Sequence, residues 1–173
     1  MTHATTPEQL ASILNPTPLP SRTVIGIDGA PGCGKSQVAR LLGPILNAPV
    51  VELDLFLNRH EGQYVKSLRL GDLRDTLAEA SGLAIVEGIC LLEVLEAISV
   101  PCDRLVYVKL MSNWGWDHAE ECDVTGDPEP RIADLRTRYA GPDGLPAGLE
   151  EVIRYHAKYR PQDRATIEYW NTI

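Results

Sequence analysis

GAPGCGKS, at residues 29–36, follows the apolar run Val24-Ile25-Gly26-Ile27 and leads into the amphipathic stretch Lys35–Leu46. The spacing Gly29-x4-Gly34-Lys35-Ser36 is the complete pattern of a phosphate-binding loop (P-loop) between a strand and a helix. Its glycines let backbone N–H groups turn inward around phosphate oxygens, and the helix N-terminus adds partial positive charge at the same point. The stretch therefore predicts a nucleotide-phosphate site.

Each residue of the loop has an expected role. Lys35 reaches the outer phosphates as a point charge and is a candidate catalytic residue, and the Ser36 hydroxyl is a candidate Mg2+ ligand. The expected nucleotide-binding set is Gly29, Ala30, Pro31, Gly32, Cys33, Gly34, Lys35, Ser36 and Gln37.

Short apolar runs alternate with helical stretches along the chain. The expected strands are 23–27, 50–53, 83–86, 104–110 and 165–169, and the expected helices are 35–46, 70–80, 91–98 and 149–159. Such alternation is typical of a parallel sheet with helices on both faces. The sequence therefore predicts an α/β protein with the P-loop NTPase fold and a sheet of about five parallel strands.

The division of the chain follows from the same pattern. Residues 1–21 are expected to form a helical segment at Pro7–Leu14 and a proline-containing linker, and residues 22–173 a single P-loop domain. Residues 112–147 differ, with Trp114, Trp116 and many acidic side chains, and are expected to form a lid-like insert. The two tryptophans could stack on an aromatic acceptor, but anchoring of the insert in the core is favoured.

Composition limits the partners. The 173 residues carry 24 acidic and 16 basic side chains, a net charge of −8. Nucleic-acid binding needs clustered Lys and Arg, so no nucleic-acid partner is expected. No apolar run approaches a membrane span and the N-terminus lacks a signal-peptide pattern, which indicates a cytoplasmic protein without a membrane partner. Both a monomer and a homodimer stay open.

Two carboxylates follow expected strands, where ligands gather in an open α/β sheet. Asp54 could accept a proton from an attacking hydroxyl or help to hold Mg2+. Glu87 ends the apolar run Leu83–Val86 and is a further candidate ligand for Mg2+. Glu52 alternates with Asp54 and is a weaker candidate.

Phosphoryl transfer also needs positive charge on the moving group. Arg136 is the chosen candidate, with Arg131 and Arg138 in the same insert and Arg154 and Arg160 as rivals. Tyr64, Lys66 and Arg69 lie where an acceptor would bind, but each is expected to be an ordinary surface residue.

Several segments together resemble the uridine kinase-like branch of the P-loop small-molecule kinases, which includes pantothenate kinase and phosphoribulokinase. The matching segments are IGIDGAPGCGKS, LDLFL, LAIVEGICLL and YHAKYRPQDRATIEY, over roughly residues 22–111 and 150–168. The resemblance implies ATP with Mg2+ as donor and a small-molecule acceptor whose hydroxyl is deprotonated or oriented by Asp54. The chain departs from the family at Leu57, where the family has tyrosine, and at SNWGWDHAEECD, where the family has an arginine-rich lid.

The sequence thus predicts an ATP-dependent phosphotransferase that acts on a hydroxyl of a nucleoside-, vitamin- or sugar-like metabolite. A GTPase would need the guanine-binding pattern Asn-Lys-x-Asp, which the chain lacks. The alternative is a nucleotide-binding protein without turnover, a degenerate kinase that acts through a partner.

Overall fold

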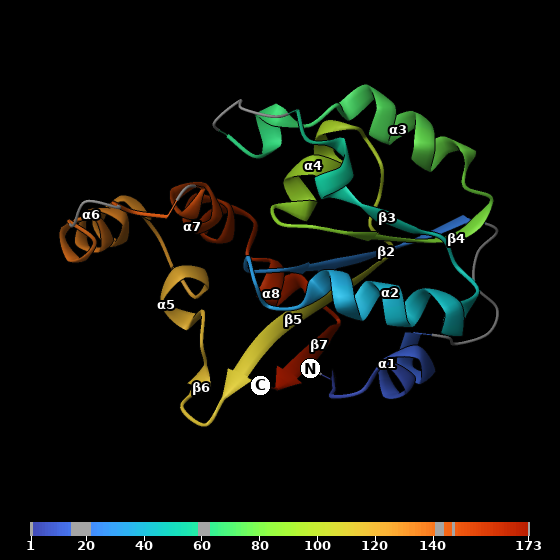
Figure 1. Cartoon of the computed structure of the whole chain (residues 1–173), viewed down its shortest axis with the longest axis horizontal. Coiled ribbons are helices and arrows are strands. Elements are labelled where there is room, and N and C mark those ends of the chain that lie inside the picture. Colours follow the sequence, from blue (N-terminus) through green and yellow to red (C-terminus); the bar gives the residue numbers. More distant parts are fainter. Residues whose placement is uncertain (1, 15–21, 59–62, 141–143, 147, 173) are drawn as a thin grey trace.

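A computed structural model of the chain describes residues 2–14, 22–58, 63–140, 144–146 and 148–172. They form one sheet with helices on both of its faces (Figure 1). The strands are β1 (Thr2–Ala4), β2 (Arg22–Gly29), β3 (Val50–Glu52), β4 (Gly82–Glu87), β5 (Arg104–Ser112), β6 (Gly115–Trp116) and β7 (Ile167–Thr172). The α-helices are α1 (Pro7–Leu14), α2 (Lys35–Leu46), α3 (Leu70–Glu79), α4 (Leu91–Ala97), α5 (Ala119–Cys122), α6 (Glu129–Arg138), α7 (Leu149–Tyr159) and α8 (Pro161–Arg164). Two short 3-10 helices, η1 (Leu53–Phe56) and η2 (Val65–Ser67), follow β3.

The strand order is β1-β7-β5-β2-β4-β3, and every neighbouring pair along it is parallel. The predicted α/β fold, with a parallel sheet and helices on both faces, is therefore confirmed. The sheet has one more parallel strand than the expected five, because Thr2–Ala4 pairs with Ile167–Tyr169 at the edge. A run of three residues is too short to show an alternating pattern. β6 adds an antiparallel hairpin to the end of β5.

Alternate residues of the central strands pack on opposite faces of the sheet, as the two-residue repeat of a strand requires. On one face Val24 and Tyr107 join a buried cluster with residues of α3, α4 and α7. On the other face Ile25 and Val106 join residues of α1 and α2. Two apolar cores therefore hold the carboxyl ends of the central strands in place, which is the edge where the P-loop lies.

The N-terminal helix has the expected bounds and packs on the main body. Leu10 and Leu14 of α1 belong to the same buried cluster as Val38 and Leu42 of α2. The expected linker falls on residues 15–21, outside the described part of the chain. Most of the turn-rich segment GPDGLPAG, at 141–148, also lies outside it.

The insert at 112–147 contains the end of the β5–β6 hairpin, α5 and α6. A separate small apolar core joins it to α7, in which Ile132 and Leu135 of α6 pack with Ile153 of α7. Trp116 packs edge-on against Tyr107 with ring centroids 5.9 Å apart, so it anchors the insert as expected. The same expectation is wrong for Trp114, which is 97% exposed at the tip of the hairpin.

Candidate active site

The P-loop has the backbone geometry that its glycines predict. Gly34 has φ +93° and directly precedes α2, and Gly29 has φ +152° at the end of β2. A Cβ at Gly34 would lie 2.3 Å from Nδ2 of Asn171, which donates a hydrogen bond to the Cys33 carbonyl at 3.0 Å. Asn171 of β7 therefore contacts the loop, and a side chain at position 34 would be strained by the positive φ and would displace the Asn171 amide.

Lys35 is 7% exposed, at the first position of α2. Its Nζ donates to the Ala30 carbonyl at 2.7 Å and lies 3.8 Å from Sγ of Cys33. The ammonium group is therefore held within the curve of the loop, where it faces the space that a phosphate chain would occupy.

The loop forms one wall of a cavity of about 470 Å³. The other walls come from η1, from the segment before η2 and from the residues that follow β4. The cavity is lined by Pro31, Gly32, Gly34, Lys35, Ser36, Gln37, Asp54, Leu57, Tyr64, Glu87, Gly88 and Ile89. Side chains from four separate parts of the sequence thus meet at one place.

Glu87 is the last residue of β4 and is only 2% exposed. Burial raises the pKa of Glu87 above its ordinary value, while the hydrogen bond from Ser36 and the charge of Lys35 act in the opposite direction. Asp54 is a further negative charge nearby and also raises this pKa. The two predicted Mg2+ ligands Ser36 and Glu87 thus line the same cavity.

Asp54 lies in η1, since β3 ends at Glu52 and the chain turns there. Oδ1 of Asp54 accepts a hydrogen bond from the Tyr64 hydroxyl at 2.7 Å. Glu52 does not line the cavity and instead makes two 2.7 Å contacts with Arg40 of α2, which lower the pKa of Glu52. Of the two alternating carboxylates, only Asp54 faces the cavity.

Asp28 is fully buried beside the loop. Its Oδ1 accepts the Gly29 N–H at 2.7 Å, and its Oδ2 accepts the hydroxyl of Tyr155 from α7. Burial raises the pKa of Asp28 to about 6, although these two hydrogen bonds and the charge of Lys35 oppose the rise. Asp28 therefore supports the loop and does not line the cavity.

The structure brings together most of the residues predicted from the sequence. The candidates Lys35, Asp54 and Glu87 share one cavity with Ser36. The other predicted nucleotide-binding residues divide into two groups. Those that line the cavity are Pro31, Gly32, Gly34 and Gln37. Those that shape the loop without lining the cavity are Gly29, Ala30 and Cys33.

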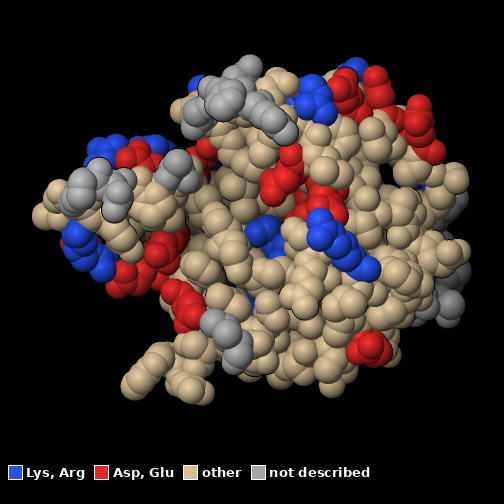
Figure 2. Space-filling model, viewed as in Figure 1, with Lys and Arg blue, Asp and Glu red and all other residues tan. Residues whose placement is uncertain are grey.

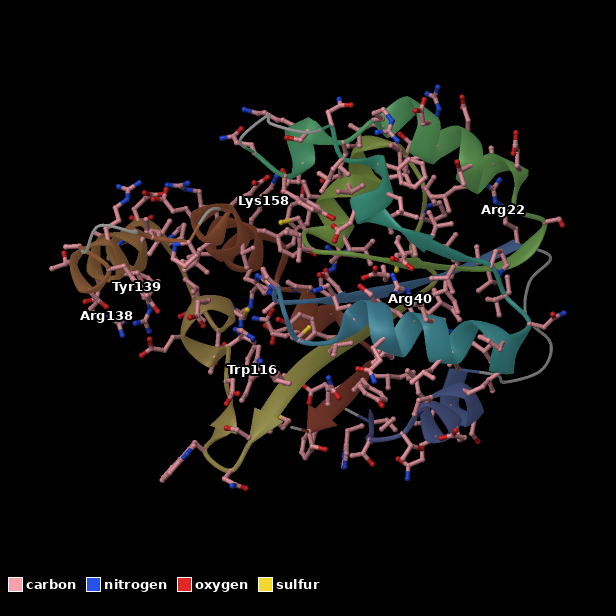
Figure 3. All side chains as sticks on the ribbon, viewed as in Figure 1. Arg22, Arg40, Trp116, Arg138, Tyr139 and Lys158 are labelled. Carbon is pink, nitrogen blue, oxygen red and sulfur yellow. The ribbon has the colours of Figure 1, made fainter. Side chains whose placement is uncertain are left out.

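Arg136 is not part of this cavity. It lies in α6, where its guanidinium group binds both carboxylate oxygens of Glu150 at 2.7 and 2.8 Å. Figure 1 shows α6 at the outer end of the insert, with α5 and α7 between it and the start of α2. Arg138 and Tyr139 lie on the same outlying lobe in Figure 3, far from Arg40 on α2. The assignment of Arg136 as a catalytic residue therefore stays a prediction.

The other arginines of the lobe formed by α5, α6 and α7 likewise make ion pairs with acidic side chains. Figure 2 shows basic and acidic side chains beside one another over the lobe. The ion pairs are Arg131–Asp134, Arg138–Glu120, Arg138–Asp134, Arg154–Glu129, Arg154–Glu150, Arg160–Asp163 and Arg160–Asp123. Among the described residues that line the cavity, Lys35 is the only Lys or Arg.

Tyr64 lines the cavity, whereas the sequence favoured an ordinary surface residue at this position over one that contacts the acceptor. Burial, together with the Asp54 carboxylate, raises the pKa of Tyr64 well above its usual range, so the phenol stays protonated and donates. Its position between β3 and α3 was the only signal in the sequence.

The fold has known counterparts among solved structures. A possible uridine kinase from Bacillus stearothermophilus matches with a TM-score of 0.53 at 14% identity, over 94% of this chain and 96% of that one. A putative fructose transport system kinase from Silicibacter sp. TM1040 has a TM-score of 0.47 at 18% identity, over 96% and 100% of the two chains. A gluconokinase from Sinorhizobium meliloti 1021 has a TM-score of 0.47 at 15% identity, over 86% and 83%. The first of these similarities shows that the chain has the fold of a P-loop kinase.

No protein-family model and no curated protein matches the chain. Within the described residues, every helix is too short or too polar to cross a membrane.

Proposed function

We propose that the chain transfers the γ-phosphoryl group of ATP, in the presence of Mg2+, to a hydroxyl of a nucleoside-, vitamin- or sugar-like metabolite. One observation carries the proposal: a single cavity is lined by the P-loop, Lys35, Glu87 and Asp54. The loop and Lys35 suit the phosphates of the donor. Asp54 comes from another element and suits the hydroxyl of the acceptor.

In the proposed reaction the acceptor hydroxyl gives its proton to Asp54, and its oxygen forms a bond to the γ-phosphorus. The bond between the γ-phosphorus and the oxygen that bridges it to the β-phosphorus breaks, and ADP leaves with that electron pair. Lys35 lies against the loop and stabilises the negative charge of the phosphates. The products are ADP and a phosphomonoester.

The residues in the cavity fit Mg2+. The described residues contain no group of three or more His, Cys, Asp or Glu side chains that could hold a metal by themselves. Mg2+ usually binds through one or two carboxylates together with waters and substrate phosphates, so Ser36 and Glu87 form a suitable oxygen donor set when Asp54 serves as the base. When bound, Mg2+ would neutralise charge on the phosphate oxygens.

The proposal includes a closing movement of the insert, which would bring Arg136 to the transferred group and exclude water. The contacts of Arg136 permit such a movement, because its ion pair with Glu150 of α7 lies at the surface, with an exposure of 57% for Arg136 and 28% for Glu150. Surface ion pairs of this kind add little to stability and are screened by salt.

The test is ADP formation from ATP and Mg2+ in the presence of nucleosides, vitamins, sugars or aminoglycoside-like alcohols, with Lys35→Ala as the blank. One acceptor should raise the rate strongly. Asp54→Asn should then lower transfer by ~100-fold or more while nucleotide binding is kept, because a general base is lost. The matched control is Asp75→Asn, which removes a carboxylate that is 74% exposed on α3. Wild-type transfer by Asp54→Asn would contradict the role of Asp54 as base.

The alternative is a protein that binds the nucleotide without turnover and acts through a partner. The observation in its favour is that the arginines of the insert are paired with acidic residues. Tight binding of ATP with no acceptor-dependent ADP formation would select this alternative.

A further inference from the structure

Glu151 connects α7 to the loop that carries Tyr64. It is the third residue of α7, and its two carboxylate oxygens accept the backbone N–H groups of Tyr64 at 2.7 Å and Val65 at 3.0 Å. These N–H groups stand at the start of η2, where a helix has no partners of its own for its first donors. Hydrogen bonds to an ionised carboxylate are about twice as strong as neutral ones. The carboxylate of Glu151 therefore fixes the backbone of Tyr64.

The side chain of Tyr64 continues this connection into the cavity. Its hydroxyl donates to Oδ1 of Asp54 at 2.7 Å, and its ring lines the cavity with Leu57. Because Oδ1 of Asp54 is already bound, Oδ2 is the oxygen left for an acceptor hydroxyl. The orientation of Asp54 thus depends on Tyr64, and the position of Tyr64 depends on Glu151.

The same helix also supports the donor side of the site. Tyr155 lies one turn after Glu151, and residues four apart share a helix face. Its hydroxyl binds Oδ2 of Asp28, directly before the P-loop, and accepts the Leu92 N–H at 3.1 Å. One face of α7 therefore contacts both the strand that leads into the P-loop and the segment at Tyr64, whose hydroxyl binds Asp54.

We propose that Glu151 is a positioning residue for the transfer reaction: it holds Tyr64, and through Tyr64 it sets the orientation of Asp54 toward the acceptor. The inference rests on the phosphotransferase function proposed above. Glu151 does not line the cavity and takes no proton from the acceptor. Its loss should therefore lower the rate of transfer and leave the binding of nucleotide unchanged.

Glu151→Gln is the first variant, because the amide oxygen can accept hydrogen bonds while its NH2 group cannot. We expect kcat to fall about tenfold, since small displacements of catalytic groups have effects of this order, with the Kd for ATP within about twofold of the wild type. Glu129→Gln is the matched control, because Glu129 also receives two hydrogen bonds, from Arg154 at 2.7 and 3.2 Å, on the surface of the insert.

A double-mutant cycle tests the route. Tyr64→Phe removes the hydroxyl and should lower kcat to a similar extent. If Glu151 acts through Tyr64, adding Glu151→Gln to Tyr64→Phe should cost less than about a further twofold. A full tenfold loss in both backgrounds would overturn the route through Tyr64, and a wild-type kcat for Glu151→Gln would overturn the positioning role.

A second measurement does not depend on turnover. Amide hydrogen exchange, followed by NMR, should become faster at Tyr64 and Val65 in Glu151→Gln and stay unchanged in Glu129→Gln. Unchanged exchange at both amides would overturn the inference, whether or not the protein is a kinase. Absence of acceptor-dependent ADP formation by the wild type would instead overturn the proposed function.

Discussion

The pH dependence of stability should report on the buried carboxyl of Asp28. In the folded protein burial raises the pKa of Asp28 from 3.8 to about 6. The fold therefore favours the neutral carboxyl. The resulting stabilisation is complete below pH 3.8 and is lost as the pH rises through about 6, because only the folded state keeps the proton in that range. At 1.36 kcal/mol for each pKa unit, the loss amounts to about 3 kcal/mol.

The assay is urea unfolding of the wild type and of Asp28→Asn at several pH values between 4 and 7.5. Asparagine does not titrate, so the difference in unfolding free energy between the two proteins isolates Asp28 from the other acids. This difference should move by about 2 kcal/mol in favour of Asp28→Asn between pH 4 and pH 7, because part of the full change lies below pH 4. The hydrogen bond from Tyr155 lowers the pKa of Asp28. In the Tyr155→Phe background the stabilisation by the neutral Asp28 carboxyl should therefore be lost at a higher pH than in the wild type. A difference that stays constant from pH 4 to pH 7 would refute the reasoning.

Two further predictions concern the P-loop and the insert. Gly34→Ala should lower the unfolding free energy by about 1–2 kcal/mol and weaken nucleotide binding, because position 34 has φ +93° and a Cβ would meet Asn171 at 2.3 Å. Thermal unfolding measures the change in stability. Gly71→Ala is the control, because a Cβ at that position has no neighbour within 4 Å. Equal melting temperatures for Gly34→Ala and the wild type would show that the loop tolerates a side chain there. Arg136→Ala should lower kcat by about 10-fold or more with an unchanged Kd for ATP if Arg136 reaches the transferred group, whereas Arg131→Ala should behave as the wild type. Equal kcat values for the two variants would remove Arg136 from the mechanism.

The sequence predicted best those elements whose pattern is local. α2 and α7 have the predicted bounds, because each carries an amphipathic repeat over three turns and is flanked by a glycine or a proline. The P-loop is also local, since glycines at fixed spacing determine its backbone. The short strands β1 and β6 were missed because two or three residues cannot show a repeat and depend on pairing with β7 and β5.

The sequence correctly predicted that the candidate carboxylates lie at one edge of the sheet. The directions of the Glu52 and Asp54 side chains, however, depend on where the backbone leaves the extended conformation. An extended strand through residue 54 would have pointed Glu52 and Asp54 the same way. The strand ends at Glu52, and η1 turns Asp54 into the cavity while Glu52 pairs with Arg40. A difference of two residues in the end of this strand therefore separates a cavity-lining carboxylate from one in a surface ion pair.

The contacts that hold the site together could not be predicted, because they join residues far apart in the sequence. Glu151 and Tyr64 are 87 residues apart, and Tyr155 and Asp28 are 127 apart. The sheet order places α7 beside both the strand before the P-loop and the segment after β3, and no sequence pattern encodes that position. The groups suited to phosphoryl transfer belong to Lys35, Asp54 and Glu87. The groups that hold the P-loop and the Tyr64 segment in position belong to Glu151 and Tyr155. Substitution of Glu151 should therefore change the rate more than the affinity, whereas substitution of Tyr155 should also weaken nucleotide binding through the P-loop.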